Sequence, residues 1–274
     1  MRVRLGAATL AACARCRTWT YAPRPNGAAQ AAIHDSDAYY GHQYFDLRRT
    51  MTPRLRRRCR ATFERVGRWI DLESLGGERL LDVGCDTGAF LRCAAEEYGV
   101  VPVGIDVAGR AVDDARRSGV EAYHATIEAA PESLKDFRVV TAIDVVEHVP
   151  DPLEFLQSVR RRIRPGGVAY LETPNIQSVV YRTGARLCGL TRGRPGAVWE
   201  RLFPPQHLQY FTRDSFASLA RRAGFEVRDI ETRPLPTEDI AASMPVRFGV
   251  AALEAWDRLA GSEILICAVV AAPD

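Results

Sequence analysis

A short loop containing two glycines is the first feature of the chain that could bind a ligand. Gly84 and Gly88 lie in the stretch Asp82-Val83-Gly84-Cys85-Asp86-Thr87-Gly88, which follows an apolar run. Glycine lets the backbone turn tightly and approach a ligand without a clash at Cβ, and a helix that begins after Gly88 offers N–H donors to a carboxylate. The Gly-x-x-x-Gly spacing therefore predicts a ligand-binding turn unlike the Gly-x-Gly-x-x-Gly turn of nicotinamide-dependent enzymes.

An aspartate after the next apolar run, Asp106 in Val103-Gly104-Ile105-Asp106, complements this loop. An acidic residue about twenty positions after such a loop can accept hydrogen bonds from both hydroxyls of a ribose. Bidentate contacts of this kind are strong and specific. The loop and Asp106 together predict a ligand that carries a ribose.

Three polar residues, Asp144, Glu147 and His148, follow a further apolar segment, and His207 comes later in the chain. A histidine has an ordinary pKa of about 6.5, which makes it a natural general base near neutral pH. We therefore take His148 as the candidate base.

The elements that must position these residues alternate between strand and helix. Strands are predicted at 79–83, 100–105, 120–123, 137–143 and 168–173, with helices at 88–98, 108–118 and 152–163 between them. This alternation predicts an α/β fold with parallel pairing and right-handed crossovers. The wholly apolar strand 137–143 predicts a sheet covered on both faces, and ligands bind beyond the carboxyl ends of such strands.

The flanking segments divide the chain into three predicted parts. Residues 1–36 read as an irregular lead-in, 37–76 as a helical cap with one apolar stripe, and 77–274 as the ligand-binding domain. Within the last part, the Gly-, Pro- and Arg-rich stretch 174–211 predicts an insertion that serves as a lid. A helix at 213–223 lies between that stretch and two closing strands, 225–232 and 263–271.

On these motifs the chain resembles a class I S-adenosylmethionine (SAM)-dependent methyltransferase, most of all the ubiquinone-biosynthesis O-methyltransferase type. The resemblance rests on the stretches Leu81–Gly88, Gly104–Asp106, Ala142–Val149, Arg164–Gly167 and Leu171–Asn175. It implies a Rossmann-like, doubly wound sheet of seven strands with the last strand antiparallel. It also implies SAM as the cofactor, bound by Asp82, Gly84, Cys85, Asp86, Gly88, Asp106, Thr126, Ile127 and Asp144. In that arrangement the glycines contact the methionine moiety, Asp106 the ribose, residues 126–128 the adenine, and Asp144 faces the sulfur.

Asp86 departs from the pattern of most relatives, which have a third glycine at this position. A carboxylate there could pair with the ammonium group of SAM, repel its carboxylate, or point to solvent. The sequence leaves these alternatives open, and with them the affinity for the cofactor.

Three interpretations of Glu147, His148 and His207 stay open. They are structural or general substrate-side residues, or His148 is a base that works without metal, or all three (with Asp144) bind a divalent metal. The last arrangement resembles that of the small-RNA 2′-O-methyltransferases, and its mixed donors suit Mn²⁺, Co²⁺ or Zn²⁺ better than Mg²⁺. Our prediction uses Glu147, His148 and His207 as catalytic residues and assigns no metal.

The seven cysteines are irregularly spaced, which is expected of reduced thiols. Cys13 and Cys16 resemble half of a zinc ribbon, but a structural zinc needs four ligands. We expect two inert thiols in a degenerate ribbon.

Composition limits the remaining choices. The net charge is only +3 and 47% of residues are hydrophobic, so nothing in the composition favours nucleic acid. The basic run Arg54–Arg60 reads as a solvated helix face, with contact to an acidic substrate or phosphate as the alternative. We expect a cytoplasmic enzyme that methylates a small molecule at oxygen, without a membrane partner. An RNA 2′-O-methyltransferase and a catalytically silent SAM-binding module are the alternatives; the oligomeric state is not predicted.

Overall fold

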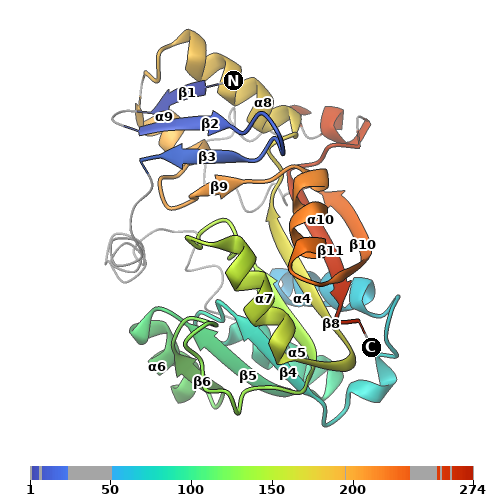
Figure 1. Cartoon of the computed structure of the whole chain (residues 1–274). Helices are drawn as coiled ribbons and strands as arrows, with labels where there is room; N and C mark the ends of the chain where they lie inside the picture. Colours follow the sequence, from blue (N-terminus) through green and yellow to red (C-terminus); the bar gives the residue numbers. More distant parts are fainter. Residues whose placement is uncertain are drawn as a thin grey trace.

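A seven-stranded sheet forms the centre of the molecule, in the order β10-β11-β8-β7-β4-β5-β6 (Figure 1). The computed structural model describes residues 2–5, 8–23, 51–194, 196–234, 252–253, 255–259 and 261–273. The strands are β4 (Arg79–Val83), β5 (Val101–Asp106), β6 (Glu121–His124), β7 (Phe137–Ile143), β8 (Ile163–Pro174), β10 (Glu226–Arg233) and β11 (Leu265–Ala271). β4 to β8 pair in parallel, whereas β11 runs antiparallel to both β8 and β10. The predicted doubly wound sheet with a reversed last strand is confirmed.

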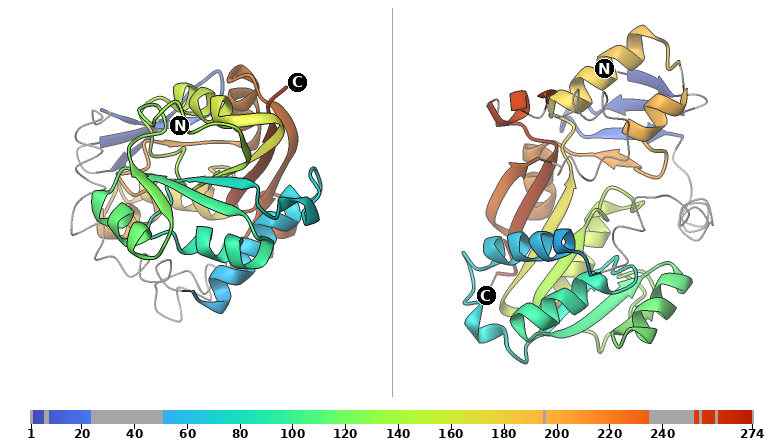
Figure 2. Two further views of the ribbon diagram at one scale, coloured as in Figure 1. Left: turned by 90° about the horizontal axis from the view of Figure 1, so that it is seen from below. Right: turned by 180° about the vertical axis from the view of Figure 1, so that it is seen from behind.

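Helices cover both faces of this sheet. They are α4 (Pro53–Val66), α5 (Ala89–Tyr98), α6 (Gly109–Arg117), α7 (Pro152–Arg162) and α10 (Arg213–Arg222). The neighbours Val139 and Val140 of β7 belong to two different cores, one shared with α4, α5 and α6 and the other with α7 and α10. In Figure 1, α7 and α10 lie in front of the sheet, and the right view of Figure 2 shows α4 and α5 on the opposite face. The apolar strand 137–143 is thus buried from both sides, as its composition predicted.

Side-chain caps set where the helices begin. Asp151 accepts hydrogen bonds from the N–H groups of Leu153 and Glu154, and Pro152 occupies the first turn of α7, where no N–H is needed. Thr212 and Ser215 form a reciprocal capping box at the start of α10. Because α7 can start only at Asp151, residues 144–150 form a loop beyond the carboxyl end of β7.

A second, four-stranded antiparallel sheet, in the order β1-β2-β3-β9, corrects the prediction of an irregular lead-in over residues 2–22, while residues 24–36 of that lead-in lie outside the described part of the chain. It contains β1 (Arg2–Leu5), β2 (Ala8–Ala12), β3 (Trp19–Ala22) and β9 (Gln209–Tyr210), and it packs with α8 (Val179–Leu190) and α9 (Gly196–Leu202). Val3, Leu10 and Tyr21 are buried against these helices. Strands this short carry few apolar residues each, so they cannot form a hydrophobic core by themselves. Side chains of the distant segment 174–211 complete that core. The predicted lid is therefore the helical layer of this small sheet, which lies above the main sheet in Figure 1; its action as a lid stays a prediction.

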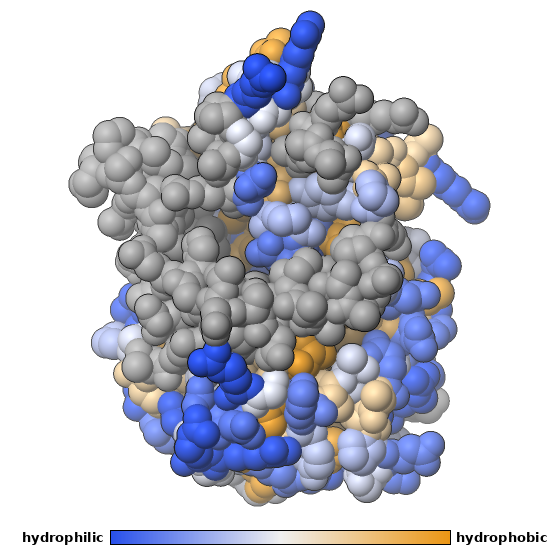
Figure 3. Space-filling view, turned by 90° about the vertical axis from the view of Figure 1, so that its left-hand side faces the viewer, coloured by the Kyte–Doolittle hydropathy of each residue, from blue (hydrophilic) through white to orange (hydrophobic). Residues whose placement is uncertain are grey.

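Of the range 37–76, predicted as a helical cap, residues 37–50 lie outside the described part of the chain, and the remainder contains α4 and the 3₁₀ turn Glu73–Leu75. Its role as a cap stays a prediction. None of the helices described is both long and apolar enough to cross a membrane. On the face shown in Figure 3, hydrophilic side chains predominate over the lower part of the molecule and the orange patches are small.

Candidate cofactor site and acceptor-side cluster

The glycine loop after β4 adopts a backbone that requires glycine. Gly84 and Gly88 have φ angles of +81° and +73°. A Cβ at Gly84 would lie 2.6 Å from a methyl carbon of Val145, and one at Gly88 would lie 3.0 Å from Val120. Here the glycines therefore allow the loop to pack closely against the strands and loops beside it.

Asp86 also has a left-handed backbone, with φ of +46°, which aspartate tolerates better than most residues. Its N–H donates to Asp106 Oδ2 at 2.8 Å, and the N–H of Ala108 donates to Oδ1 at 2.9 Å. Burial raises the pKa of Asp106, while these two donors act against the rise. The carboxylate expected to hold the ribose is therefore fixed in place by the backbone on both of its oxygens.

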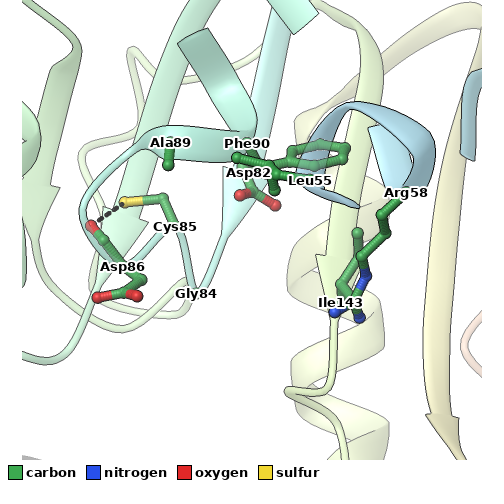
Figure 4. A pocket seen from close by; sticks show the side chains of 9 residues that line it. All are labelled: Leu55, Arg58, Asp82, Gly84, Cys85, Asp86, Ala89, Phe90 and Ile143. Atoms are coloured by element: carbon green, nitrogen blue, oxygen red, sulfur yellow. Dashed lines mark hydrogen bonds between the residues drawn. The ribbon is translucent and has the colours of Figure 1, made fainter. Parts of the chain in front are cut away.

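A pocket of about 440 Å³, including its solvent-open mouth, lies beside this loop (Figure 4). Its lining residues are Leu55 and Arg58 of α4, Asp82, Gly84, Cys85 and Asp86 of the loop region, Ala89 and Phe90 of α5, and Ile143 of β7. Four of these, Asp82, Gly84, Cys85 and Asp86, are predicted cofactor residues. Gly88 and Asp106 lie next to them along the loop and at the end of β5, whereas Thr126 and Ile127 follow β6 and do not line this pocket. Ile127 is buried in the core, and the Thr126 hydroxyl accepts from the N–H of Ala129 at 3.3 Å.

Arg58 was not predicted as a site residue, because the basic run Arg54–Arg60 reads as a solvated helix face. Arg58 Nη2 donates to Asp144 Oδ2 at 3.0 Å and to Glu172 Oε1 at 2.8 Å. The signal was present in the helical periodicity, because Arg58 stands three positions after Leu55 and beside Cys59, both on the buried stripe of α4. One arginine of the basic run thus turns towards the pocket, and it contacts Asp144, the predicted neighbour of the cofactor sulfur.

The predicted acceptor-side residues come together although 58 positions separate His148 from Gln206. One ligand atom each of Glu147, His148 and His207 lies within 4.8 Å of the others, and the two imidazole centroids are 4.6 Å apart. Gln209 joins the two segments, because its side-chain amide donates to the carbonyls of Val146 and Val149 at 3.2 and 3.0 Å. The strand β9 therefore holds His207 against the loop that follows β7.

Hydrogen bonds orient two members of this cluster. His148 Nδ1 lies 2.9 Å from the carbonyl oxygen of Gln206, which can only accept, so Nδ1 carries the proton. Glu147 is fully buried, and its Oε2 accepts from Thr173 at 3.0 Å. Its Oε1 is also buried, with no hydrogen-bond partner among the residues described. Burial, and then the charge of Asp144, raise the pKa of Glu147.

These residues fit the groups that the predicted chemistry needs. Arg58 and two aspartates line the pocket, and this combination of charges suits a zwitterionic amino-acid group. One carboxylate with a buried unsatisfied oxygen and two imidazoles form a donor set suited to Zn²⁺, Mn²⁺ or Co²⁺.

Cys13 and Cys16 are exposed in the turn between β2 and β3. Among the residues described, no third histidine, cysteine or carboxylate groups with them as a metal site would require. The backbone N–H groups of Cys16 and Arg15 lower the pKa of Cys13. The degenerate ribbon remains a prediction.

Comparison with known proteins identifies the family of the chain. The model of a methyltransferase domain family matches residues 44–230. The ubiquinone biosynthesis O-methyltransferase of Pseudomonas paraeruginosa is 33% identical over 173 residues, which cover 59% of this chain and 71% of that protein. The enzyme of the same name from Paracidovorax citrulli is 30% identical over 177 residues, covering 60% and 74%.

Solved structures share the fold at low sequence identity. A phosphoethanolamine N-methyltransferase of Haemonchus contortus, in complex with S-adenosylhomocysteine, aligns with a TM-score of 0.63 at 14% identity and covers 100% of this chain and 72% of its own. A SAM-dependent methyltransferase of Mesorhizobium loti aligns with a TM-score of 0.53 at 16% identity, covering 77% and 97%. The chain belongs to the SAM-dependent methyltransferase family. It is an enzyme whose cofactor is SAM.

Proposed function

We propose that the chain transfers the methyl group of SAM to a hydroxyl oxygen of a small-molecule acceptor, with His148 at the reacting end of the site. The observation that carries this proposal is the cluster in which Glu147 and His148, on the loop directly after β7, meet His207, which precedes β9. The same loop begins with Asp144, which contacts the pocket residue Arg58. The names of the relatives, ubiquinone biosynthesis O-methyltransferases, support oxygen as the accepting atom.

In the proposed reaction an oxygen lone pair attacks the methyl carbon in line with the sulfur. The new O–C bond forms as the C–S bond breaks, the sulfur keeps the bonding electrons, and S-adenosylhomocysteine leaves. The acceptor proton goes to His148 Nε2, which carries the lone pair because Nδ1 donates to the Gln206 carbonyl. SAM is already a reactive donor, so the main contribution of the protein is alignment of the two reactants.

A divalent metal is compatible with the same residues. Glu147, His148 and His207 would hold it, and when bound it would stabilise the ionised acceptor hydroxyl. With the metal bound, His148 Nε2 would be a ligand, so the acceptor proton would go to water instead of to His148. Both versions therefore require the cluster. The versions differ in whether activity depends on a metal.

The test is transfer of labelled methyl from SAM to separate panels of phenols, catechols, alcohols, carboxylic acids, amines and single-stranded RNA. We expect a labelled ether from one of the hydroxyl panels. His148→Gln should lower kcat by about 10²- to 10⁴-fold, with affinity for S-adenosylhomocysteine unchanged. Chelation followed by restoration of single metals then separates the two versions.

Transfer to amines alone would contradict oxygen as the acceptor, and labelled RNA would favour the RNA alternative. Cofactor binding without transfer to any panel would favour a silent module. A His148→Gln variant as active as wild type would remove the role assigned to the cluster.

A further inference from the structure

Four charged side chains form a network of contacts that reaches the cofactor pocket. Arg233 of β10 donates to Glu172 of β8 through Nε at 2.9 Å and Nη2 at 2.6 Å. Glu172 in turn accepts from Arg58 of α4 at 2.8 Å, and Arg58 donates to Asp144 at 3.0 Å. The contacts thus join β10, β8, α4 and the end of β7.

Glu172 is at the centre of this network and is fully buried. Burial by itself favours its protonated form, but Arg58 and Arg233 hold the pKa of Glu172 below its ordinary value. Tyr170 adds a hydroxyl donor at 2.8 Å. A buried carboxylate therefore stays ionised because two guanidinium groups share it, and removal of either leaves its charge undercompensated.

Arg58 is the member of this network that reaches the pocket. It lines the pocket together with Leu55 of the same helix, on the β7 side of the glycine loop, whereas Asp106 lies at the end of β5 on the other side. Since Asp106 is expected to hold the ribose, Arg58 lies towards the methionine end of SAM. Two other ion pairs join this region to β10, Arg65 of α4 with Glu231 and Arg68, just after α4, with Asp229 at 2.9 Å, but neither arginine lines the pocket. The Arg68 pair is the more exposed of the two, and exposed pairs fix a helix only weakly.

We infer that Glu172 and Arg233 are positioning residues for cofactor binding, which hold Arg58 over the methionine end of the pocket. Arg233 does so without lining the pocket, because its two hydrogen bonds hold the Glu172 carboxylate in the orientation that meets Arg58. This inference depends on the SAM cofactor and not on the identity of the acceptor.

The test compares two ligands by calorimetry, S-adenosylhomocysteine and 5′-methylthioadenosine, which lacks the amino-acid portion. We expect Arg233→Gln to weaken binding of S-adenosylhomocysteine by on the order of tenfold to a hundredfold and to leave binding of 5′-methylthioadenosine within about twofold. Arg233→Lys should recover part of the loss, because it restores the charge but not the paired donors. Glu172→Gln should also weaken S-adenosylhomocysteine selectively, and the double variant should be little worse than the worse single variant.

Arg228→Gln is the matched control, because Arg228 lies on the same strand and is exposed, in an ion pair with Glu226. A thermal melt of each variant checks folding, and if Arg233→Gln is unfolded at the assay temperature, Arg233→Lys and Glu172→Gln carry the test. Equal losses for both ligands, or a folded Arg233→Gln with wild-type affinity, would overturn the inference. Wild-type protein that binds neither ligand would refute the cofactor site itself, and the inference with it.

Discussion

Replacement of Arg162 by methionine tests how the chain builds the loop after β6. Arg162, on α7, is buried, and its guanidinium donates to four backbone carbonyls, those of Ile127, Ala130, Pro131 and Leu134, at 2.6 to 3.1 Å. No carboxylate takes part in these bonds. The loop that carries Ile127, a residue expected near the adenine, is therefore shaped around one cation.

The expected loss follows from the number of these bonds. Methionine preserves much of the apolar stem of Arg162 but leaves four carbonyls without their donor. At about 1 kcal/mol net for each bond, the free energy of unfolding should fall by about 4 kcal/mol. For a chain of this size the melting temperature should fall by on the order of 10 °C. Lysine, whose single ammonium cannot span four acceptors, should lose about half as much.

The assay is urea unfolding followed by circular dichroism, with a thermal melt in parallel. Arg161→Met is the matched control, because Arg161 is the preceding residue, is exposed and donates only to the Ser158 hydroxyl among the bonds described. We also expect weaker binding of S-adenosylhomocysteine by folded Arg162→Met. If Arg162→Met and Arg161→Met unfold alike, the carbonyl bonds do not stabilise the loop and the reasoning fails.

Three further predictions concern the cofactor loop and the N-terminal turn. Asp106→Asn should lower affinity for S-adenosylhomocysteine by at least about tenfold, with Asp113→Asn, an exposed change on α6, as the control in calorimetry. Burial raises the pKa of Asp106, and the ionised carboxylate is the form expected to accept the ribose hydroxyls. As the pH is lowered, the affinity of the wild type should therefore begin to fall at a pH above about 3.9, the ordinary pKa of aspartate. The variant should not show this pH dependence. Gly84→Ala should both lower the melting temperature and abolish binding, since a side chain at φ +81° is strained and clashes; a stable variant that binds normally would contradict this. Mass spectrometry after brief alkylation at pH 7 should find Cys13 and Cys16 modified before the buried thiols, and Cys13 first, because N–H groups lower its pKa; equal rates for the two would count against that effect.

Local constraints account for what the sequence alone determined. The turn at Gly84 and Gly88 needs backbone angles that other residues resist, so it is visible in the residue types. The apolar run 137–143 likewise reflects a local constraint, because a strand buried on both faces needs apolar side chains on both. These features sufficed to predict the covered parallel sheet and the tight turn of the glycine loop, whereas the antiparallel last strand was implied by the resemblance to the methyltransferases.

Tertiary structure decided the features that join distant segments. Arg58 looked like one of several solvated arginines until α4 packed beside β8 and brought it to Glu172 and Asp144. The strands β1 to β3 have a hydrophobic core only because residues of the segment 174–211 pack against them. The pairing of β9 with β3 brings His207 to His148. Such pairings depend on register and on the closure of long loops, which residue spacing within one segment does not encode. The cofactor loop could therefore be recognised from the sequence, whereas the charge network behind the pocket forms only in the folded molecule.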